Sequence, residues 1–327
     1  MITTRISDLI GRTPLLKLPL AEGGATVLLK LEQFNPTGTA KIRMARNMVD
    51  EAEEAGLLAP GGRLVESTSG NTGLGLALIA AERGYKFTAV VDNHSSVDKL
   101  RGMRAYGADI LNVAGNEEGL ATAERDTVAE RLAAEHGAYW TAQHRNEGNP
   151  NGYRPLAREL HDDLGDSIDY LYGAVGTGGS LCGTGRFLRE RIPDLKIIGV
   201  EPVGSVVFGG PGAPYHQSGT GTPEGSEIGR VVDYDVFDEG LKVSDSEAFE
   251  TCRHLARHFG IMIGGSAGGV VYKALERART APPGTTIVVL VCDGGDKYLD
   301  TVFDDDWMAA HGLFDEQAAR RLAALLR

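Results

Sequence analysis

A single lysine at the start of a predicted helix is the residue of this chain best placed for covalent chemistry. Lys41 follows a strand-like segment and an Asn-Pro-Thr-Gly turn at residues 35–38, and it precedes a helix-forming run at 44–48. At such a junction an amine can reach a bound cofactor, whereas most lysines are solvated surface charges. Three further loops, at residues 67–73, 176–180 and 264–269, would supply an anion pocket, a phosphate site and a hydroxyl near a helix start. Together they predict that Lys41 forms a Schiff base with pyridoxal phosphate.

The predicted phosphate site is the loop Gly176-Thr177-Gly178-Gly179-Ser180, which follows a buried strand and opens a helix. Glycines let backbone amides approach a ligand closely, and a helix N-terminus carries positive potential, so the loop suits an oxyanion. The alternative is a dinucleotide site, because Glu201 ends the next strand where a ribose-binding acid would stand. The spacing opposes it, since Leu181 occupies the third glycine position of the G-x-G-x-x-G pattern. Simple tight packing of strand on helix is the third possibility.

The predicted anion pocket is the loop Ser67-Thr68-Ser69-Gly70-Asn71-Thr72-Gly73, which also joins a strand to a helix. Several hydroxyls, an amide side chain and backbone donors within one turn suit a carboxylate at a helix N-terminus, although capping alone would need one of them. The third loop carries Ser266 near a helix start, where it could be an N-cap or a neutral partner for a pyridine nitrogen. A neutral ring is a weaker electron sink, which favours prompt β-elimination.

The elements that must position these loops alternate between strand and helix. Most of the predicted helices end at a glycine, as left-handed C-caps do. Strands are predicted at residues 26–31, 63–66, 87–91, 109–113 and 138–141, and continuous apolar runs predict further strands at 168–175, 195–200 and 286–291. This alternation predicts an α/β fold with a parallel sheet covered on both faces. The segment 204–229, dense in Gly and Pro, is predicted to form an active-site flap or a dimer contact.

Length and composition exclude several classes of protein. The 327 residues predict two domains, or one unit with a subdomain. A net charge of −12 without a basic stripe argues against a nucleic-acid or anionic-membrane partner. We expect no signal peptide and no membrane span. The three cysteines are too far apart for a disulfide framework or a CxxC metal site, and we expect no metal.

Beyond these loops, the chain resembles the cysteine synthase and cystathionine β-synthase family of fold-type II pyridoxal-phosphate enzymes over nearly its full length. The matching segments, in chain order, are residues 6–15, the Lys41 loop, 68–73, 176–180, Ser266-Ala267-Gly268 and the closing motif at 293–299. The set is specific to the family and says little about the substrate.

The resemblance implies a fold similar to the β-subunit of tryptophan synthase, with two domains and mainly parallel twisted sheets. A larger cofactor-binding domain would comprise residues 1–35 and 144–327. A smaller, mobile domain, 36–143, would carry the substrate loop. The resemblance also implies a homodimer that acts on small-molecule amino acids, and the three widely spaced cysteines are typical of a cytoplasmic protein.

Individual roles follow from the same resemblance. Lys41 would be the catalytic, cofactor-binding lysine, and Ser266 would face the pyridine nitrogen. The remaining cofactor ligands would be Asn71, at the ring hydroxyl, and Gly176, Thr177, Gly178, Gly179 and Ser180, at the phosphate. The substrate would be held by Thr68, Ser69, Asn71, Thr72 and Gln143.

Two departures from the family pattern bear on the substrate. Ile42 replaces the usual Asp after the lysine, and residues 201–210 resemble the subgroup that makes 2,3-diaminopropionate precursors. They imply β-replacement on an O-activated L-serine (O-phosphoserine or O-acetylserine) through an aminoacrylate, with an amino-acid amine such as L-glutamate as nucleophile. Arg154 stands where the family has small hydroxyl residues, and either it or Arg43 could bind the acceptor carboxylate.

Other functions stay open at this point. The first alternative is a cysteine synthase or cystathionine β-synthase that uses sulfide or homocysteine. A serine or threonine dehydratase and a non-catalytic scaffold are the others, although an intact lysine with all its loops argues against a scaffold.

Overall fold

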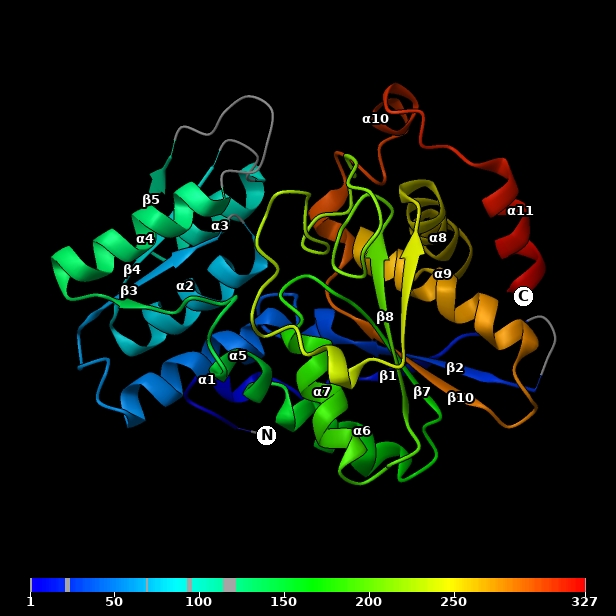
Figure 1. Ribbon diagram of the computed structural model, residues 1–327, viewed down its shortest axis with the longest axis horizontal. Helices are drawn as coiled ribbons and strands as arrows, with labels where there is room; N and C mark the ends of the chain where they lie inside the picture. Colours follow the sequence, from blue (N-terminus) through cyan, green and yellow to red (C-terminus); the bar gives the residue numbers. More distant parts are fainter. Residues whose placement is uncertain (1, 21–23, 69, 93–95, 114–121, 327) are drawn as a thin grey trace.

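The computed structural model describes residues 2–20, 24–68, 70–92, 96–113 and 122–326, and its two sheets lie in separate halves of the molecule (Figure 1). The larger sheet has six strands. In spatial order they are β1 (Leu15–Lys17), β2 (Thr26–Leu31), β10 (Thr286–Val291), β7 (Tyr170–Ala174), β8 (Lys196–Pro202) and β9 (Glu239–Val243). Among them only the β1–β2 pair is antiparallel.

The centre of this sheet is made by β2, β10 and β7. Strands β10 and β2 pair in register from Thr286 beside Thr26 to Val291 beside Leu31. Apart from its first residue β10 is buried, because helices cover both faces of the sheet. A strand buried on both faces needs apolar, preferably β-branched side chains throughout, which explains its continuous apolar run.

The helices of the larger half pack on opposite faces of the sheet. Val289 contacts the core on one face and Val288 the core on the other, as alternating strand residues do. The first face carries α8 (Asp245–Phe259), α9 (Gly265–Thr280), α10 (Asp305–Ala310) and α11 (Glu316–Leu325), and the second carries α6 (Arg154–Leu164) and α7 (Gly179–Arg189). A capping box between Ser244 and Glu247 starts α8.

The smaller sheet has four strands, all parallel. Their order is β5 (Asp109–Asn112), β4 (Lys86–Val91), β3 (Arg63–Ser67) and β6 (Tyr139–Trp140). Its helices are α1 (Lys41–Glu54), α2 (Asn71–Arg83) and α3 (Val97–Ala105) on one side and α4 (Thr122–His136) on the other. The remaining short elements are α5 (Gly148–Asn151) and the 3-10 turns Ile6–Leu9, Glu32–Phe34, Tyr234–Val236 and Gly295–Tyr298.

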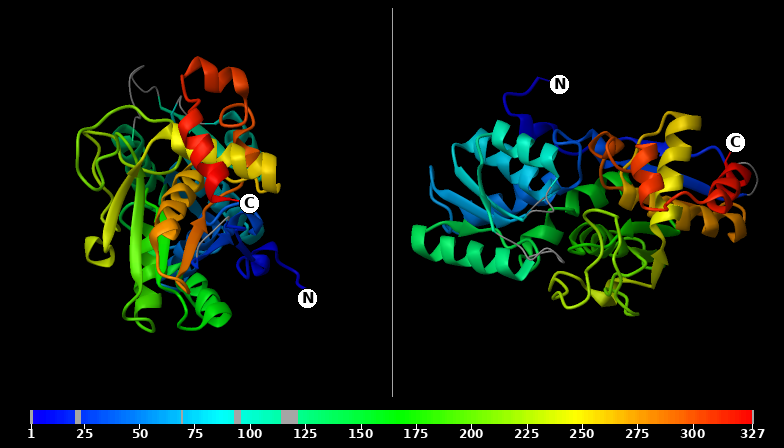
Figure 2. Two further views of the ribbon diagram at one scale, coloured as in Figure 1. Left: turned by 90° about the vertical axis from the view of Figure 1, so that its right-hand side faces the viewer. Right: turned by 90° about the horizontal axis from the view of Figure 1, so that it is seen from above.

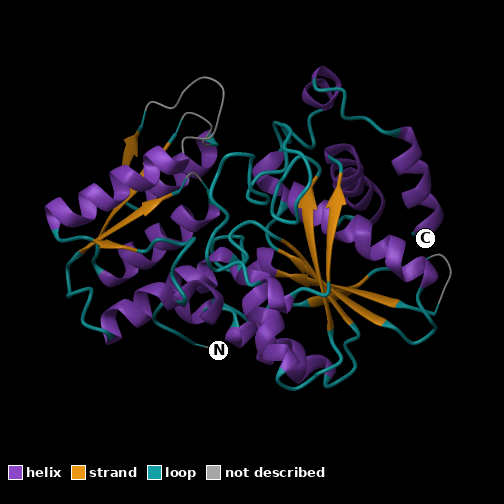
Figure 3. Cartoon of the chain, viewed as in Figure 1, coloured by secondary structure: helices purple, strands orange, loops and turns teal. Residues whose placement is uncertain are grey.

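The predicted fold class is therefore correct: the structure is α/β with two mainly parallel sheets. Seen from above, the two halves lie side by side along the long axis, and loops and short helices run between them (Figures 2 and 3). All strands of the smaller sheet fall within residues 36–143. The domain boundaries and the mobility of the smaller domain stay predictions. Strands β1 and β9 were not predicted; each is an edge strand, and β1 has only three residues.

Candidate active site

Lys41 is the first residue of α1, and the loop before it is attached to the end of the central strand β10. The amide of Ala40 donates to the carbonyl of Cys292 at 2.8 Å, and Thr39 pairs with Asp293 as an isolated bridge. The amide of Lys41 itself donates to the Thr39 hydroxyl at 3.3 Å. The lysine side chain is partly exposed. Its amine is thus placed at the carboxyl edge of the larger sheet, where open α/β sheets bind ligands.

Asp293 joins the lysine loop to two other predicted loops. Its Oδ2 accepts hydrogen bonds from Asn71 Nδ2 and from the Tyr298 hydroxyl, both at 2.7 Å. Its carbonyl accepts from the amide of Gly264, the N-cap of the helix that carries Ser266, at 3.1 Å. The structure therefore brings Lys41, Asn71 and the Ser266 loop together. The sequence prediction used Asp293 only as part of the closing motif; the signal it overlooked was a carboxylate two residues after a buried parallel strand.

Ser266 is buried and is the second residue of α9. Because Gly264 is the N-cap, the alternative that Ser266 merely caps its helix is wrong. The serine is instead in the first helical turn, behind the loop that contacts Asp293.

The glycine-rich loop forms the N-terminus of α7 and requires its glycines. Gly178 has φ +87°, and a Cβ there would lie 2.9 Å from the Cα of Val232. A Cβ on Gly176 would lie 2.7 Å from the carbonyl oxygen of Gly219, and one on Gly179 would collide with the Asn149 side chain. The backbone therefore packs closely on its surroundings while the first amides of α7 stay unpaired within the helix, which is the arrangement that binds phosphate.

Asn149 connects this loop to the predicted substrate residues and was not predicted as a site residue. It is fully buried, and its Nδ2 donates to Thr177 Oγ1 at 3.1 Å and to the carbonyl of Gln143 at 2.7 Å. In the sequence Asn149 stands in a segment rich in Asn and Gly, residues 143–152, and nothing local indicated this role.

The predicted substrate loop lies where β3 and β6 end side by side. Thr72 donates to Gln143 Oε1 at 2.6 Å, and Gln143 Nε2 donates to the carbonyl of Ser67 at 3.1 Å. Thr68 Oγ1 accepts from the amide of Gly73 at 3.2 Å. This hydroxyl thus pairs with an amide in the first turn of α2, as an N-cap side chain would. Ser69, also predicted here, lies outside the described residues.

Glu66, the residue before the last of β3, is a buried carboxyl next to this loop. Complete burial raises the pKa of Glu66 to about 8, although the hydrogen bond from the Thr141 hydroxyl acts to lower it. Glu66 also accepts from the amide of Gln143 at 3.3 Å. At neutral pH the Glu66 carboxyl is therefore mostly uncharged. It would not repel an anion bound by the neighbouring Gln143 side chain.

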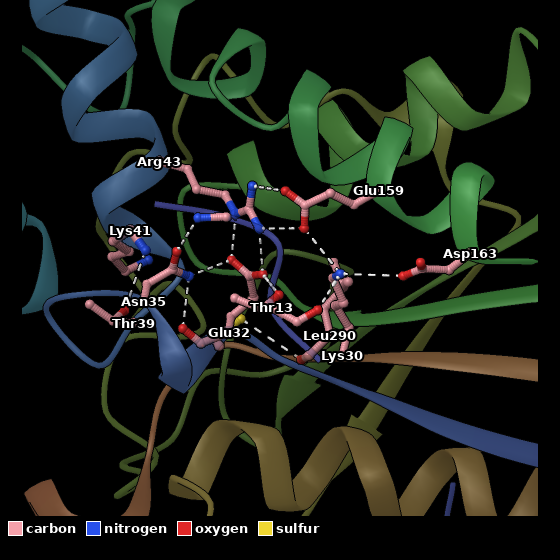
Figure 4. A network of polar contacts seen from close by, with 12 residues as sticks. Thr13, Lys30, Glu32, Asn35, Thr39, Lys41, Arg43, Glu159, Asp163 and Leu290 are labelled. Carbon is pink, nitrogen blue, oxygen red and sulfur yellow. Dashed lines mark hydrogen bonds and ion pairs between the residues drawn. The ribbon is translucent and has the colours of Figure 1, made fainter. Parts of the chain in front are cut away.

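Arg43, proposed from the sequence as a clamp for the acceptor carboxylate, is instead part of a buried ion cluster behind Lys41 (Figure 4). Its Nε lies 2.6 Å from Glu32 Oε2, and its Nη1 lies 2.8 Å from Glu159 Oε1. Burial is the largest single influence and acts to lower the pKa of Arg43, but the charges of Glu32 and Glu159 and the hydrogen bonds to them together outweigh it and raise that pKa. That prediction is wrong, because the guanidinium is 2% exposed and already paired with two carboxylates.

The structure does not bring Arg154 to the group around Lys41. Its side chain is exposed at the start of α6, and its guanidinium carbon lies 4.2 Å from the centre of the Phe187 ring. Phe187 is eight residues after Gly179 at the start of α7, about 12 Å along the helix. Among the described contacts, Arg154 has none with Lys41, Asn71 or Gln143.

The 204–229 segment packs on the glycine-rich loop without forming a helix or strand. The amide of Gly221 and the hydroxyl of Thr220 donate to the carbonyl of Val175 at 2.7 and 3.1 Å. Glu201 anchors its start, because the buried carboxylate accepts from the amides of Val207 and Phe208 at 3.0 and 2.9 Å. This carboxylate is used by its own chain, which argues against the ribose-binding role of a dinucleotide site.

Unpaired buried oxygens mark where a polar ligand fits. In the part of the chain that the structure describes, Oδ1 of Asn71, of Asp293 and of Asn149 has no hydrogen-bond partner. Each such group costs about 1–3 kcal/mol unless something pairs with it. Together with the Lys41 amine and the open N-terminus of α7, they suit a phosphorylated, polar-ringed aldehyde such as pyridoxal phosphate. Within the described residues there is no cluster of His, Cys, Asp and Glu suited to a metal, and no helix long and apolar enough to cross a membrane.

Comparison with known proteins agrees with this geometry. A family model described as "Pyridoxal-phosphate dependent enzyme" matches residues 6–293. A protein of Sinorhizobium fredii named "Putative cysteine synthase" is 49% identical over 325 residues, 98% of this chain and 97% of that protein. A protein of Ralstonia nicotianae named "N-(2-amino-2-carboxyethyl)-L-glutamate synthase" is 37% identical over 319 residues, 94% and 92% of the two chains. The crystal structure of O-ureido-L-serine synthase matches with a TM-score of 0.86 at 34% identity, covering 94% of this chain and 100% of that one.

Proposed function

This chain belongs to the cysteine synthase family of pyridoxal-phosphate dependent β-replacement enzymes, and we propose that its reaction joins an O-activated L-serine to the amine of an amino acid, L-glutamate being the first choice. The donor would be O-phospho-L-serine or O-acetyl-L-serine. The β-substituent leaves, and the amine adds at Cβ.

The observation that carries the donor half of this proposal is that Asp293 contacts both the loop before Lys41 and Asn71, while Thr72, the next residue, contacts Gln143. Lys41 would hold pyridoxal phosphate through its amine, with Ser266 at the ring nitrogen and the 176–180 loop at the phosphate. When bound, the cofactor supplies an electron sink for negative charge at Cα. Once its amine is free, Lys41 would remove the proton from Cα of the donor.

The residues around Gln143 would orient the donor. Thr72 and Gln143 would bind its α-carboxylate at the N-terminus of α2, where the helix dipole also favours an anion. The neutral carboxyl of Glu66 below them avoids repulsion. With the carboxylate held at one end and the amine at Lys41, the Cα proton would point to the lysine amine.

Two observations support an amino-acid acceptor. The Ralstonia relative is named for a product in which the amine of L-glutamate carries a 2-amino-2-carboxyethyl group, as addition of glutamate at Cβ would give. Residues 201–210 resemble the same subgroup. Of the arginines proposed from the sequence, Arg43 is already paired with carboxylates, and the described contacts place Arg154 over Phe187. A role of Arg154 in acceptor binding stays a prediction.

Sulfide is the second candidate acceptor. The relative that is 49% identical is named as a cysteine synthase, and sulfide needs no carboxylate clamp. A dehydratase or a non-catalytic scaffold would follow only if no acceptor added.

The test is a product analysis with the cofactor-loaded protein. Each donor is incubated with L-glutamate, sulfide or L-homocysteine, and the products are identified by mass. We expect an adduct that contains the carbon skeletons of both serine and glutamate. Cysteine as the sole product would establish the second candidate, pyruvate from the donor alone would indicate a dehydratase, and no turnover would indicate a scaffold.

We also propose a cytoplasmic homodimer in which residues 36–143 move as a unit on the larger domain. The support is the family resemblance and the placement of the smaller sheet within that range. Light scattering of the purified protein would give the mass of the assembly, and a monomer would overturn the dimer.

A further inference from the structure

Lys99 is a buried lysine for which the proposed reaction has so far no role. It lies on α3 with 5% of its surface exposed, and its Nζ is 5.0 Å from the centre of the Tyr298 ring. In the described residues no carboxylate lies within ion-pair distance of this amine. Burying an ammonium without an ionic partner lowers the stability of the fold. A role in binding would explain why a lysine stands at this position.

The packing of α3 places the Lys99 amine near the N-terminus of α2. Met103, one turn after Lys99 on the same face of α3, fills the space that a Cβ on Gly73 would need. On the other side, Tyr298 donates to Asp293, which also accepts from Asn71, the first residue of α2. The lysine therefore comes from the smaller half of the molecule and reaches residues of the larger half beside Lys41.

The charges around Lys99 leave room for an anion. Burial lowers the pKa of Lys99; Asp293 acts to raise it, and the positive charges of Lys297 and Lys41 lower it further. Lys297 already donates to the carbonyls of Thr37 and Gly38 at 3.1 and 2.7 Å. The Tyr298 ring stabilises the ammonium only partly.

We propose that Lys99 binds a substrate oxyanion other than the donor α-carboxylate, either the phosphate of O-phospho-L-serine or a carboxylate of the acceptor amino acid. The inference rests on the proposed function and deepens it. The α-carboxylate is assigned above to the pair Thr72 and Gln143, whereas Lys99 supplies a cation on the side of Asp293 and Tyr298. It also supplies a cation that the paired Arg43 does not.

The test compares substrates that differ in charge. Lys99→Met and Lys99→Gln remove the cation, and Lys99→Arg retains it. Lys86→Met, at the exposed start of β4, is the matched control. Steady-state constants are measured for O-phospho-L-serine against O-acetyl-L-serine, and for L-glutamate against sulfide. Calorimetry gives the dissociation constant of O-phospho-L-serine, and melting temperatures and cofactor content check the fold.

Loss of a charge-assisted hydrogen bond should weaken binding of the anionic substrate about tenfold or more. A raised KM and dissociation constant for O-phospho-L-serine assign Lys99 to the leaving phosphate. A raised KM for L-glutamate alone assigns it to the acceptor. In either case turnover of O-acetyl-L-serine with sulfide stays within about twofold, and Lys99→Arg recovers most of the loss.

An equal loss with all substrates, or none, would overturn the proposal and leave Lys99 as a packing residue on Tyr298. If the wild type turned over no donor, the proposed function would fail. Calorimetry with O-phospho-L-serine would still test whether Lys99 binds the oxyanion.

Discussion

Asn71 Nδ2 donates to Asp293 Oδ2 at 2.7 Å, and this hydrogen bond spans 222 residues of the chain. It connects the start of α2 in the smaller half to the residue that follows β10 and Cys292 in the larger half. Any movement that separates the halves must break this bond or exchange it for one to a ligand. The candidate site therefore depends on how the two halves are held together.

Removal of the lysine amine should abolish catalysis and leave the fold intact. We expect Lys41→Ala to lower turnover by at least about 10²–10⁴-fold, the contribution of proton transfer alone. Its side chain is partly exposed and its helix starts on backbone contacts, so the melting temperature should barely change. Borohydride reduction followed by peptide mapping should place the cofactor on Lys41; recovery on Lys30, Lys99 or Lys273 would refute the assignment.

Substitution of Ser266 should show whether its hydroxyl contacts the cofactor ring or only packs within the protein. Ser266→Ala should slow β-replacement by up to about tenfold, the loss of one neutral hydrogen bond, since water can replace the hydroxyl. Ser266→Asp should retain cofactor but slow the reaction more, because it would hold the ring nitrogen protonated. Absorbance spectra and single-turnover rates measure both effects. Unchanged spectra and rates in both variants would mean that Ser266 does not face the ring.

The ion cluster behind Lys41 should matter for stability more than any surface pair. Arg43→Met leaves the buried carboxylate of Glu32 without its cation, and we expect a loss of about 3–5 kcal/mol in the free energy of unfolding. Arg101→Met, which breaks an exposed pair with Asp98, should change it by no more than about 0.5 kcal/mol. Urea denaturation compares the two variants. Similar losses would show that the buried cluster adds little.

Glu66 should make stability depend on pH. Its pKa rises from 4.5 to about 8 on folding, so between these values the folded protein holds one proton more than the unfolded chain. The free energy of unfolding should therefore fall by about 1.4 kcal/mol per pH unit as the pH rises through this window, and level off above it.

Glu66→Gln should remove that slope, because the amide is neutral throughout and its oxygen still accepts from Thr141. Glu54→Gln, at an exposed position, is the control and should keep the wild-type slope. Denaturation curves between about pH 5 and 8 measure the difference. Parallel curves for wild type and Glu66→Gln would place the proton elsewhere.

Local pattern was enough to predict the elements that carry the site. The continuous apolar run of β10, the junction at Lys41 and the glycine-rich start of α7 are all encoded within a few consecutive residues, because burial on both faces and close backbone approach restrict the side chains allowed. The alternation of strands and helices along the chain likewise predicts parallel sheets covered by helices. Short edge strands such as β1 carry too little pattern to be recognised.

Only the tertiary structure decided which charges are available. From the sequence, Arg43 could bind a substrate carboxylate, yet in the structure it pairs with Glu159, which is 116 residues away. Asp293, Glu66 and Lys99 acquire their roles from partners on other elements, through burial and hydrogen bonding that no local pattern records. The sequence by itself determined which segments alternate as strand, loop and helix. Long-range packing determined which side chains meet there and with what charge, because desolvation and pairing depend on neighbours far apart in the chain.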